Sequence, residues 1–155
     1  MDLRSIYTMF GVRSAKELHN VYAELDQQLM KEGRWDYTNP SLLTNRVRCA
    51  LARVDLEKLD EEEREWCREI IWFWHHHAIS CAIGRHNKPE AQFHAEEALR
   101  YQGKGHPNQI TYLLHLLVHD KIECAESWAA QIVCDVERNT AAELIREYKA
   151  GLFFA

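Results

Sequence analysis

Apolar residues recur at every third or fourth position along most of the chain, which is the spacing of amphipathic α-helices. No stretch alternates between apolar and polar residues over enough positions to predict a β-strand. The pattern predicts helices that begin near residues 14, 39, 60, 87, 107, 122 and 140. We therefore expect an all-α fold in which about seven helices pack antiparallel to one another.

Side-chain caps mark several of these helix starts. Ser14 followed by Glu17 has the pattern of a capping box, in which each side chain bonds to the backbone near the other. The same spacing recurs at three later starts: Asp60 and Glu63, Asn87 and Glu90, and Thr140 and Glu143. Asn39 with Pro40 begins the second helix, Pro107 begins the fifth, and the glycines at 33, 103 and 151 end three of the helices.

The composition agrees with a single helical domain over residues 1–155. Hydrophobic residues make up 46% of the chain and charged residues 28%, and both fractions are ordinary for a globular protein. Only three prolines and six glycines interrupt the chain, and no linker or low-complexity run divides it. The helices are expected to form either an array of α-hairpins or an irregular helical bundle.

Charge and hydropathy argue against two classes of partner. The chain has 19 Lys and Arg residues against 24 Asp and Glu residues, a net charge of −5, so non-specific binding to nucleic acid is not expected. The most apolar window, residues 70–74, is far shorter than the ~20 apolar residues of a membrane span. No secretory signal is recognisable, and the five cysteines fall within helical patterns, as expected of reduced core residues. We therefore expect a cytoplasmic protein with no membrane partner.

A weak internal repeat lies between residues 75 and 132. Ala91 and Ala125 stand 34 residues apart, each early in the second helix of a predicted hairpin, and Ala95 and Ala129 recur at the same offset. Small residues with this period resemble the tetratricopeptide family. Both units differ from that family because they lack the aromatic and Leu-Gly residues of its first helix and its terminal proline. Another helical array or a bundle is therefore the alternative.

The resemblance implies a scaffold whose groove binds a protein or peptide partner. The residues expected to line the groove are Phe73, His76 and Ser80 from the first unit, and Tyr112 and His115 from the second. Trp74 is a further candidate, since an exposed aromatic residue on its helix would mark a partner surface. A second copy of the chain, joined through this helix or through the apolar tail at 152–154, is an alternative partner. This interpretation involves no catalysis and no cofactor.

Histidine is abundant, with nine in the chain and most of them between residues 75 and 119. His119 and Asp120 form a His-Asp pair that resembles the core of the HD phosphohydrolases. The resemblance implies a divalent metal held by this pair, by an upstream histidine such as His77, and by Asp135, with a metal-activated water that attacks a phosphoester. Residues 121–123 and the position of Asp135 do not match that family. A metal-dependent phosphohydrolase is therefore the alternative to the interaction module.

Glu90, His94 and Glu97 share one face of a predicted helix, because they are spaced four and three residues apart. Faces of this kind build di-metal sites in helical bundles, but those sites use a Glu-x-x-His motif on two helices. No Glu-x-x-His motif occurs in this chain. We interpret the face as exposed to solvent, with an ion pair that stabilises the helix.

Overall fold

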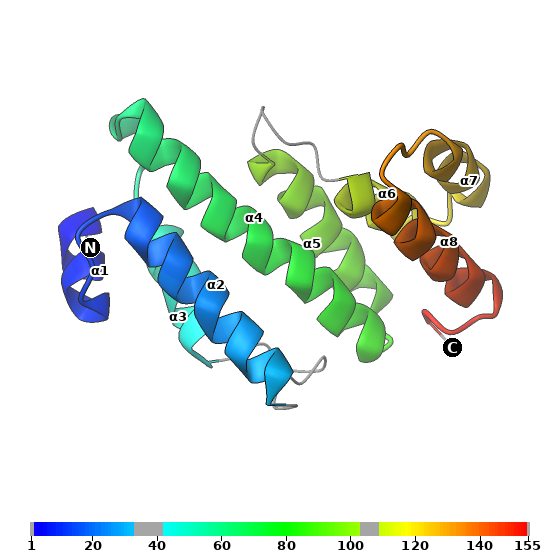
Figure 1. The fold of residues 1–155 in the computed structure, drawn as a ribbon, viewed down its shortest axis with the longest axis horizontal. Coiled ribbons are helices and arrows are strands. Elements are labelled where there is room, and N and C mark those ends of the chain that lie inside the picture. The colour runs from blue at the N-terminus through cyan, green and yellow to red at the C-terminus, as the bar shows by residue number, and fades with distance from the viewer. Residues whose placement is uncertain (1, 33–41, 103–108, 155) are drawn as a thin grey trace.

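The computed structural model describes residues 2–32, 42–102 and 109–154, and every regular element within these ranges is a helix. The elements are α1 (Leu3–Phe10), α2 (Ala15–Lys31), α3 (Leu42–Leu51), the 3-10 helix η1 (Leu56–Lys58), α4 (Glu61–Gly84), α5 (Lys88–Tyr101), α6 (Gln109–Val118), α7 (Ile122–Ala130) and α8 (Asp135–Lys149). The expected all-α fold is confirmed, and the molecule extends from α1–α3 at one end through α4 and α5 to α6–α8 at the other (Figure 1). Within the described ranges, none of them is long and apolar enough to cross a membrane.

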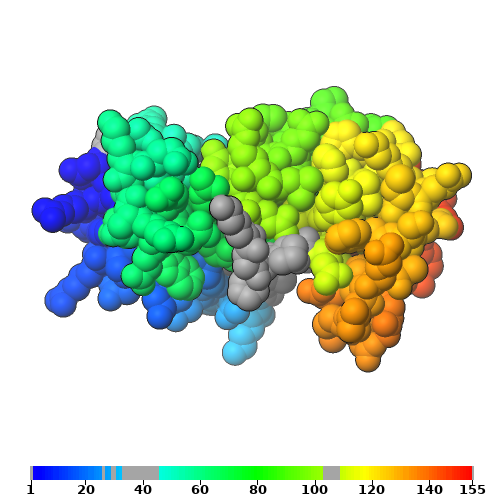
Figure 2. Space-filling model, turned by 90° about the horizontal axis from the view of Figure 1, so that it is seen from above, coloured from blue at the N-terminus to red at the C-terminus, as the bar shows by residue number. Residues whose placement is uncertain are grey.

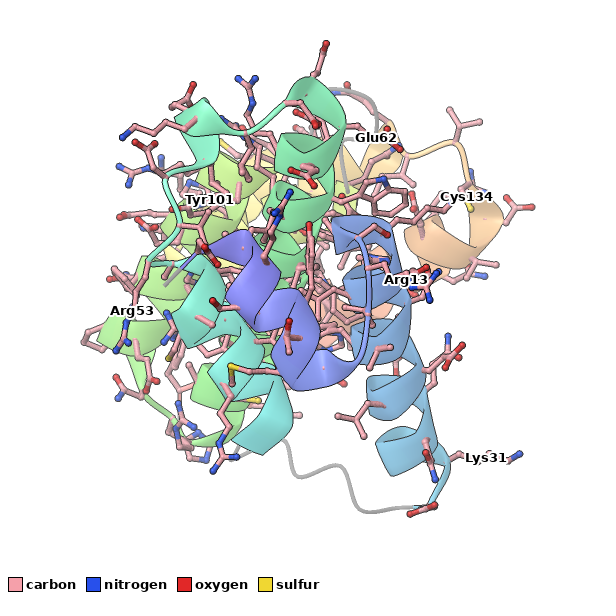
Figure 3. All side chains as sticks on the ribbon, turned by 90° about the vertical axis from the view of Figure 1, so that its left-hand side faces the viewer. Arg13, Lys31, Arg53, Glu62, Tyr101 and Cys134 are labelled. Atoms are coloured by element: carbon pink, nitrogen blue, oxygen red, sulfur yellow. The ribbon has the colours of Figure 1, made fainter. Side chains whose placement is uncertain are left out.

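The sequence analysis does not single out α1, which has only two turns. Asp2 caps its start, where its carboxylate accepts a 2.9 Å hydrogen bond from the amide of Ser5. Gly11 ends the helix with a φ of 66°, a left-handed conformation that glycine adopts without strain. Its apolar residues Leu3, Ile6, Tyr7 and Phe10 do keep helical spacing, so the signal is present in the sequence although the sequence analysis does not use it. The helix lies against α2 and α3 at the N-terminal end of the molecule (Figure 3).

Three of the four predicted caps are confirmed. The amide of Glu17 donates to Ser14 Oγ (3.2 Å), that of Glu63 to Asp60 Oδ1 (2.9 Å), and that of Glu90 to Asn87 Oδ1 (3.2 Å). These bonds satisfy amides of the first helical turn, which have no partner within the helix. The helix ends predicted at 33 and 103, and the starts predicted at 39–40 and 107, lie outside the described residues.

The prediction that Thr140 caps the last helix is wrong. α8 begins at Asp135, directly after Cys134, and Thr140 lies inside it with its hydroxyl bonded to the carbonyl of Val136 (3.0 Å). Threonine makes this bond to the preceding turn from interior helical positions, and it caps helix starts with the same hydroxyl. A threonine followed by a glutamate therefore does not by itself locate the first residue of a helix.

The longest helix, α4, is shared by two hydrophobic clusters. One cluster joins α4 to α1, α2 and α3, and the other joins it to α5 and the helices that follow. Trp74 belongs to the first cluster and Trp72 to the second, while Phe73 packs against both. Figure 1 shows α2 on one side of α4 and α5 on the other. Because α4 is covered on more than one side, its aromatic residues are distributed around the helix instead of along one stripe.

The helices after α3 form two successive hairpins, α4 with α5 and α6 with α7, and α8 packs against both helices of the second hairpin. Ala91, Ala95 and Ala98 of α5 and Ala125 of α7 are fully buried. Small side chains at these positions let neighbouring helices approach closely. The space-filling view shows the second hairpin and α8 stacked beyond the first along the molecule (Figure 2). An array of α-hairpins is consistent with this arrangement.

The C-terminal tail folds back onto its own domain. Phe153 is buried in the second cluster, where its ring centroid lies 5.7 Å from that of Tyr148. Its carbonyl lies 3.3 Å from Nδ1 of His86, at the turn between α4 and α5. Phe153 is thus a core residue of this chain. It is not exposed for contact with a second copy, as the sequence analysis expected of residues 152–154.

Candidate functional site

An open groove of about 320 Å³ lies between α6 and α7. Tyr112 and Leu116 line it from α6, where their spacing of four residues places them on one helical face. From α7 and the residue after it, the lining side chains are Glu123, Cys124, Ser127, Trp128 and Gln131. Both helices belong to the same hairpin, so the short turn at Asp120 sets the distance between the two walls.

Two aromatic side chains form the apolar surface of the groove. The ring centroids of Tyr112 and Trp128 lie 4.5 Å apart, with the ring planes inclined at 58°. The indole nitrogen of Trp128 donates a 3.0 Å hydrogen bond to the carbonyl of Gln109, which fixes the orientation of the ring. Leu116 is buried beside them, whereas Tyr112 is 37% exposed. The groove therefore presents a preformed aromatic surface to solvent.

One carboxylate adjoins this surface. Glu123 is the only charged residue that lines the groove within the described part of the chain, and it is exposed. No ion pair of Glu123 is present among the described residues, whereas its neighbour Glu126 lies 2.5 Å from the ammonium of Lys149. The groove therefore combines aromatic faces with a negative charge that no described side chain balances.

His115 and His119 continue the α6 face beyond Tyr112. The ring of His115 lies 6.2 Å from that of Tyr112 and 4.4 Å from that of His119. Burial, and then the neighbouring His119, lowers the pKa of His115. His119 itself is turned away from the groove, because its Nδ1 lies 2.8 Å from the carbonyl of His115 and its Nε2 lies 3.2 Å from Oε1 of Glu96.

Asp120 connects three helices through its side chain. It stands in the turn after α6 with a φ of 59°, and its amide bonds to the carbonyl of Leu117 (3.1 Å). One carboxylate oxygen bonds to the ammonium of Lys88 at the start of α5, and the other accepts a 2.6 Å bond from the hydroxyl of Tyr148 on α8. These two hydrogen bonds lower the pKa of Asp120, and the bond to Asp120 raises the pKa of Tyr148 to about 12. We call this group the Asp120 clamp.

The structure does not bring the four predicted metal ligands together, and Asp135 stands at the start of α8 with its carboxylate paired to Arg138. His119 bonds to α5 through Glu96, Asp120 bonds to Lys88 and Tyr148, and His77 lies on α4 with its ring 4.5 Å from that of Phe73. Within residues 2–32, 42–102 and 109–154, no group of three or more His, Cys, Asp or Glu side chains is placed to hold a metal ion. The geometry therefore lends no support to the phosphohydrolase interpretation.

Two of the six predicted partner residues lie at the groove, Tyr112 as part of its lining and His115 beside it. The other four lie on α4, away from it. Trp74 is only 7% exposed, and the guanidinium of Arg48 covers its ring at 4.1 Å from the centroid. The prediction that Trp74 belongs to an exposed partner surface is therefore wrong.

Of the remaining three α4 residues, Phe73 and His76 take part in packing between helices. The ring of Phe73 lies 5.5 Å from that of Tyr22 on α2, and Nδ1 of His76 lies 2.7 Å from the hydroxyl of Thr111 on α6. Ser80 is half-buried. Because the groove is formed by the two helices of one hairpin, residues of α4 do not reach it.

Trp128 and Glu123 are two of the groove residues that the sequence analysis does not predict as partner-binding. The apolar spacing of the sixth predicted helix assigns Trp128 to the core, and one tryptophan can satisfy that pattern while keeping a face open. Nothing in the spacing of Glu123 distinguishes it from other surface glutamates. The positions of these residues opposite Tyr112 follow from the packing of α6 on α7.

A buried pair of histidines lies between α4 and α5. Nδ1 of His75 is 3.1 Å from Nδ1 of His94, so one ring donates and the other accepts. Burial, followed by His94 and Arg48, lowers the pKa of His75 to about 3, and burial also lowers that of His94 despite the nearby Glu90. His94 is only 7% exposed, so the interpretation of the Glu90, His94 and Glu97 face as exposed to solvent is wrong at its central residue.

Comparison with known proteins adds no identification. No protein-family model matches the chain, and no match is found among curated proteins or solved structures. The resemblances to tetratricopeptide repeats and to HD phosphohydrolases thus rest on the motifs alone. The class that the structure defines is an all-α protein with a preformed aromatic groove in its second hairpin.

Proposed function

We propose that this protein is a helical interaction module without catalysis, and that it binds a partner protein through the groove between α6 and α7. The observation that favours this function is the exposed Tyr112 beside Trp128, next to a carboxylate that no described side chain balances. The segment that suits the groove is a peptide with a lysine or arginine next to an apolar residue.

The chemistry of the groove supports this choice of partner. A cation over an aromatic face gains about 0.5–1 kcal/mol at an exposed site, and Glu123 would add an opposite charge at the same place. The apolar neighbour in the peptide would contact Leu116 and the ring of Trp128. Because the indole is already held by Gln109, little ordering of the groove is needed on binding. An acidic peptide would be repelled by Glu123 and by the net charge of −5.

Selection from a library of phage-displayed random peptides tests the proposal. The wild-type protein should enrich peptides that combine Arg or Lys with a neighbouring apolar residue. Tyr112→Ala should weaken the affinity of a selected synthetic peptide by about tenfold or more. Glu123→Gln should reduce both the affinity and its dependence on salt, because it removes the charge that attracts the peptide.

Two matched variants control for the loss of an exposed aromatic side chain and for the loss of a negative charge outside the groove. Phe93→Ala removes an aromatic residue that is 55% exposed on α5, and Glu126→Gln removes a charge from α7. Both should leave the affinity within about twofold of the wild type. Selected peptides without basic residues, or a Tyr112→Ala protein that binds as well as the wild type, would contradict the proposal.

A further inference from the structure

The side chains with which α7 lines the groove form two rows of different character. One row consists of three exposed polar side chains, spaced four residues apart and therefore on one helical face: Glu123, Ser127 and Gln131. Cys124 and Trp128 form the second row, one position further round the helix, and Trp128 contacts Tyr112 of α6. The groove thus has an apolar strip on the side of α6 and a row of polar side chains on its outer side.

Two members of the polar row have hydrogen-bonding groups that the described fold does not use. No hydrogen bond of the Ser127 or Gln131 side chain is present within residues 2–32, 42–102 and 109–154. The amide of Gln131 both donates and accepts, and so does the hydroxyl of Ser127. A peptide main chain offers one N–H donor and one carbonyl acceptor at each residue. These two side chains can therefore bind the main chain of a partner whatever its sequence.

The dimensions of the groove suit an extended chain better than a helix. Gln131 follows Glu123 by eight positions, so the row is ~12 Å long at a rise of 1.5 Å per residue. Over that length, the groove volume of about 320 Å³ gives a mean cross-section of roughly 27 Å². An α-helix with its side chains is about 10–12 Å in diameter, which is a cross-section of roughly 80 Å² or more. An extended main chain is only about 5 Å across, as the spacing of strands in sheets shows.

The spacing of the polar row also matches an extended chain. Successive members of the row are ~6 Å apart along α7, and alternate residues of an extended chain are ~6.6 Å apart. Neighbouring side chains of an extended chain point to opposite sides. An apolar side chain can therefore contact Leu116 and Trp128 while its basic neighbour turns toward Glu123. A helix would instead place neighbouring side chains about 100° apart, so they would not reach both sides of the groove.

We propose that the groove binds its partner as a short extended strand of about four residues, held along its main chain by Ser127 and Gln131. This inference rests on the proposed function, because it specifies how the same groove binds a peptide. The two polar side chains supply hydrogen bonds that are independent of the peptide sequence. Leu116 and Trp128 bind an apolar side chain, and Glu123 selects a basic neighbour.

The peptide acetyl-Ala-Leu-Arg-Leu-Ala-amide is the probe that tests the binding mode. Titration into the full chain, followed by backbone amide shifts in NMR spectra, should show saturable binding with shifts at residues 112–116 and 123–131. Transferred nuclear Overhauser effects report the shape of the bound peptide. They should be strong between each Hα and the next amide proton, as in an extended chain. They should be weak between successive amide protons, which lie close together in a helix.

Methylation of the peptide amides, one at a time, tests the main-chain bonds. Successive N–H groups of an extended chain point to opposite sides, so sensitive and tolerant positions should alternate along the peptide. Gln131→Leu should weaken the peptide by about threefold to tenfold, because it removes a hydrogen bond to the main chain. Asn139→Leu is the matched control, since Asn139 is an exposed amide on α8 that does not line the groove. Its affinity should equal that of the wild type.

Four results would overturn the proposal: a helical bound peptide, equal effects of methylation at every amide, wild-type affinity in Gln131→Leu, and no saturable binding of the probe. The phage-display experiment separates this failure from failure of the proposed function. If selected peptides still bind through Tyr112, only the extended binding mode is refuted. If neither they nor the probe bind, the interaction function is refuted as well.

Discussion

The hydroxyl of Tyr148 donates a 2.6 Å hydrogen bond to the carboxylate of Asp120, and this bond connects α8 to the turn between α6 and α7. The same carboxylate bonds to Lys88 at the start of α5. Three segments that are distant in sequence therefore meet at one side chain. Asp120, which resembles a metal ligand in sequence, serves in the structure as a link between helices.

We expect Asp120→Ala to lower the free energy of unfolding by about 1–2 kcal/mol, because both bonds are lost from a half-exposed group. Alanine also tolerates a φ of 59° less well than aspartate does. Asp120→Asn keeps the tolerance of this conformation and should cost less. Urea unfolding followed by circular dichroism measures both changes, and equal stability of Asp120→Ala and the wild type would disprove the role of the clamp.

The buried histidine pair predicts a loss of stability in acid. The pKa of His75 falls from 6.5 to about 3 on folding, so the unfolded chain takes up a proton that the folded chain refuses. Stability from this site is complete above pH 6.5 and declines as the pH falls toward 3. The double variant His75→Phe with His94→Leu should therefore lose less stability than the wild type over this interval. Denaturant unfolding at a series of pH values measures the difference.

Thr140→Ala provides the control for this experiment, because it changes no titratable group. It should retain the pH dependence of the wild type. If the double variant showed the same slope of unfolding free energy against pH as the wild type, the acid sensitivity would have to arise elsewhere.

Two neighbouring alanines on α8 test the packing of the last helix. Ala141 is fully buried in the second cluster, whereas Ala142 is exposed. Ala141→Leu should destabilise the protein by about 1–3 kcal/mol through overpacking, and Ala142→Leu should change stability by less than about 0.5 kcal/mol. Thermal and urea unfolding distinguish the two, and similar effects of both substitutions would show that α8 packs through a different face.

The corrected start of α8 leads to a test of Thr140. Because Thr140 is an interior residue, Thr140→Ala should be neutral or slightly stabilising, since alanine has the higher helix propensity. Asn87→Ala removes a true cap of α5 and should cost about 1 kcal/mol. If Thr140→Ala lowered the free energy of unfolding as much as Asn87→Ala does, the last helix would begin at Thr140, as the sequence predicts.

Much of the local structure could be predicted because its causes lie within a few residues. The caps at Ser14, Asp60 and Asn87 each involve a bond to a residue three positions later. The buried alanines of α5 and α7 also follow from their spacing, since small residues at a helical period indicate a close helix neighbour. α1 was not predicted although Asp2 caps it and Leu3, Ile6, Tyr7 and Phe10 keep helical spacing, so this local signal was missed.

The candidate sites could be predicted only in part. Tyr112 and His115 were placed on the same predicted helix, but Trp128, which contacts Tyr112, lies across a turn, and spacing alone does not indicate which face of α7 meets α6. Trp74 was expected at the surface, because the sequence contains no sign that α1, α2 and α3 would cover its side of α4. His119 and Asp120 are adjacent in sequence, yet their side chains bond to different helices.

The sequence by itself determined that this chain is all-α, where most of its helices lie and which small residues they bury, because helix formation and capping depend on neighbours within one turn. Only the tertiary structure decided which faces meet. It created the aromatic groove between α6 and α7, the histidine pair and the Asp120 clamp. The physical reason is that each of these features joins residues on different helices, and their distances depend on how whole helices pack.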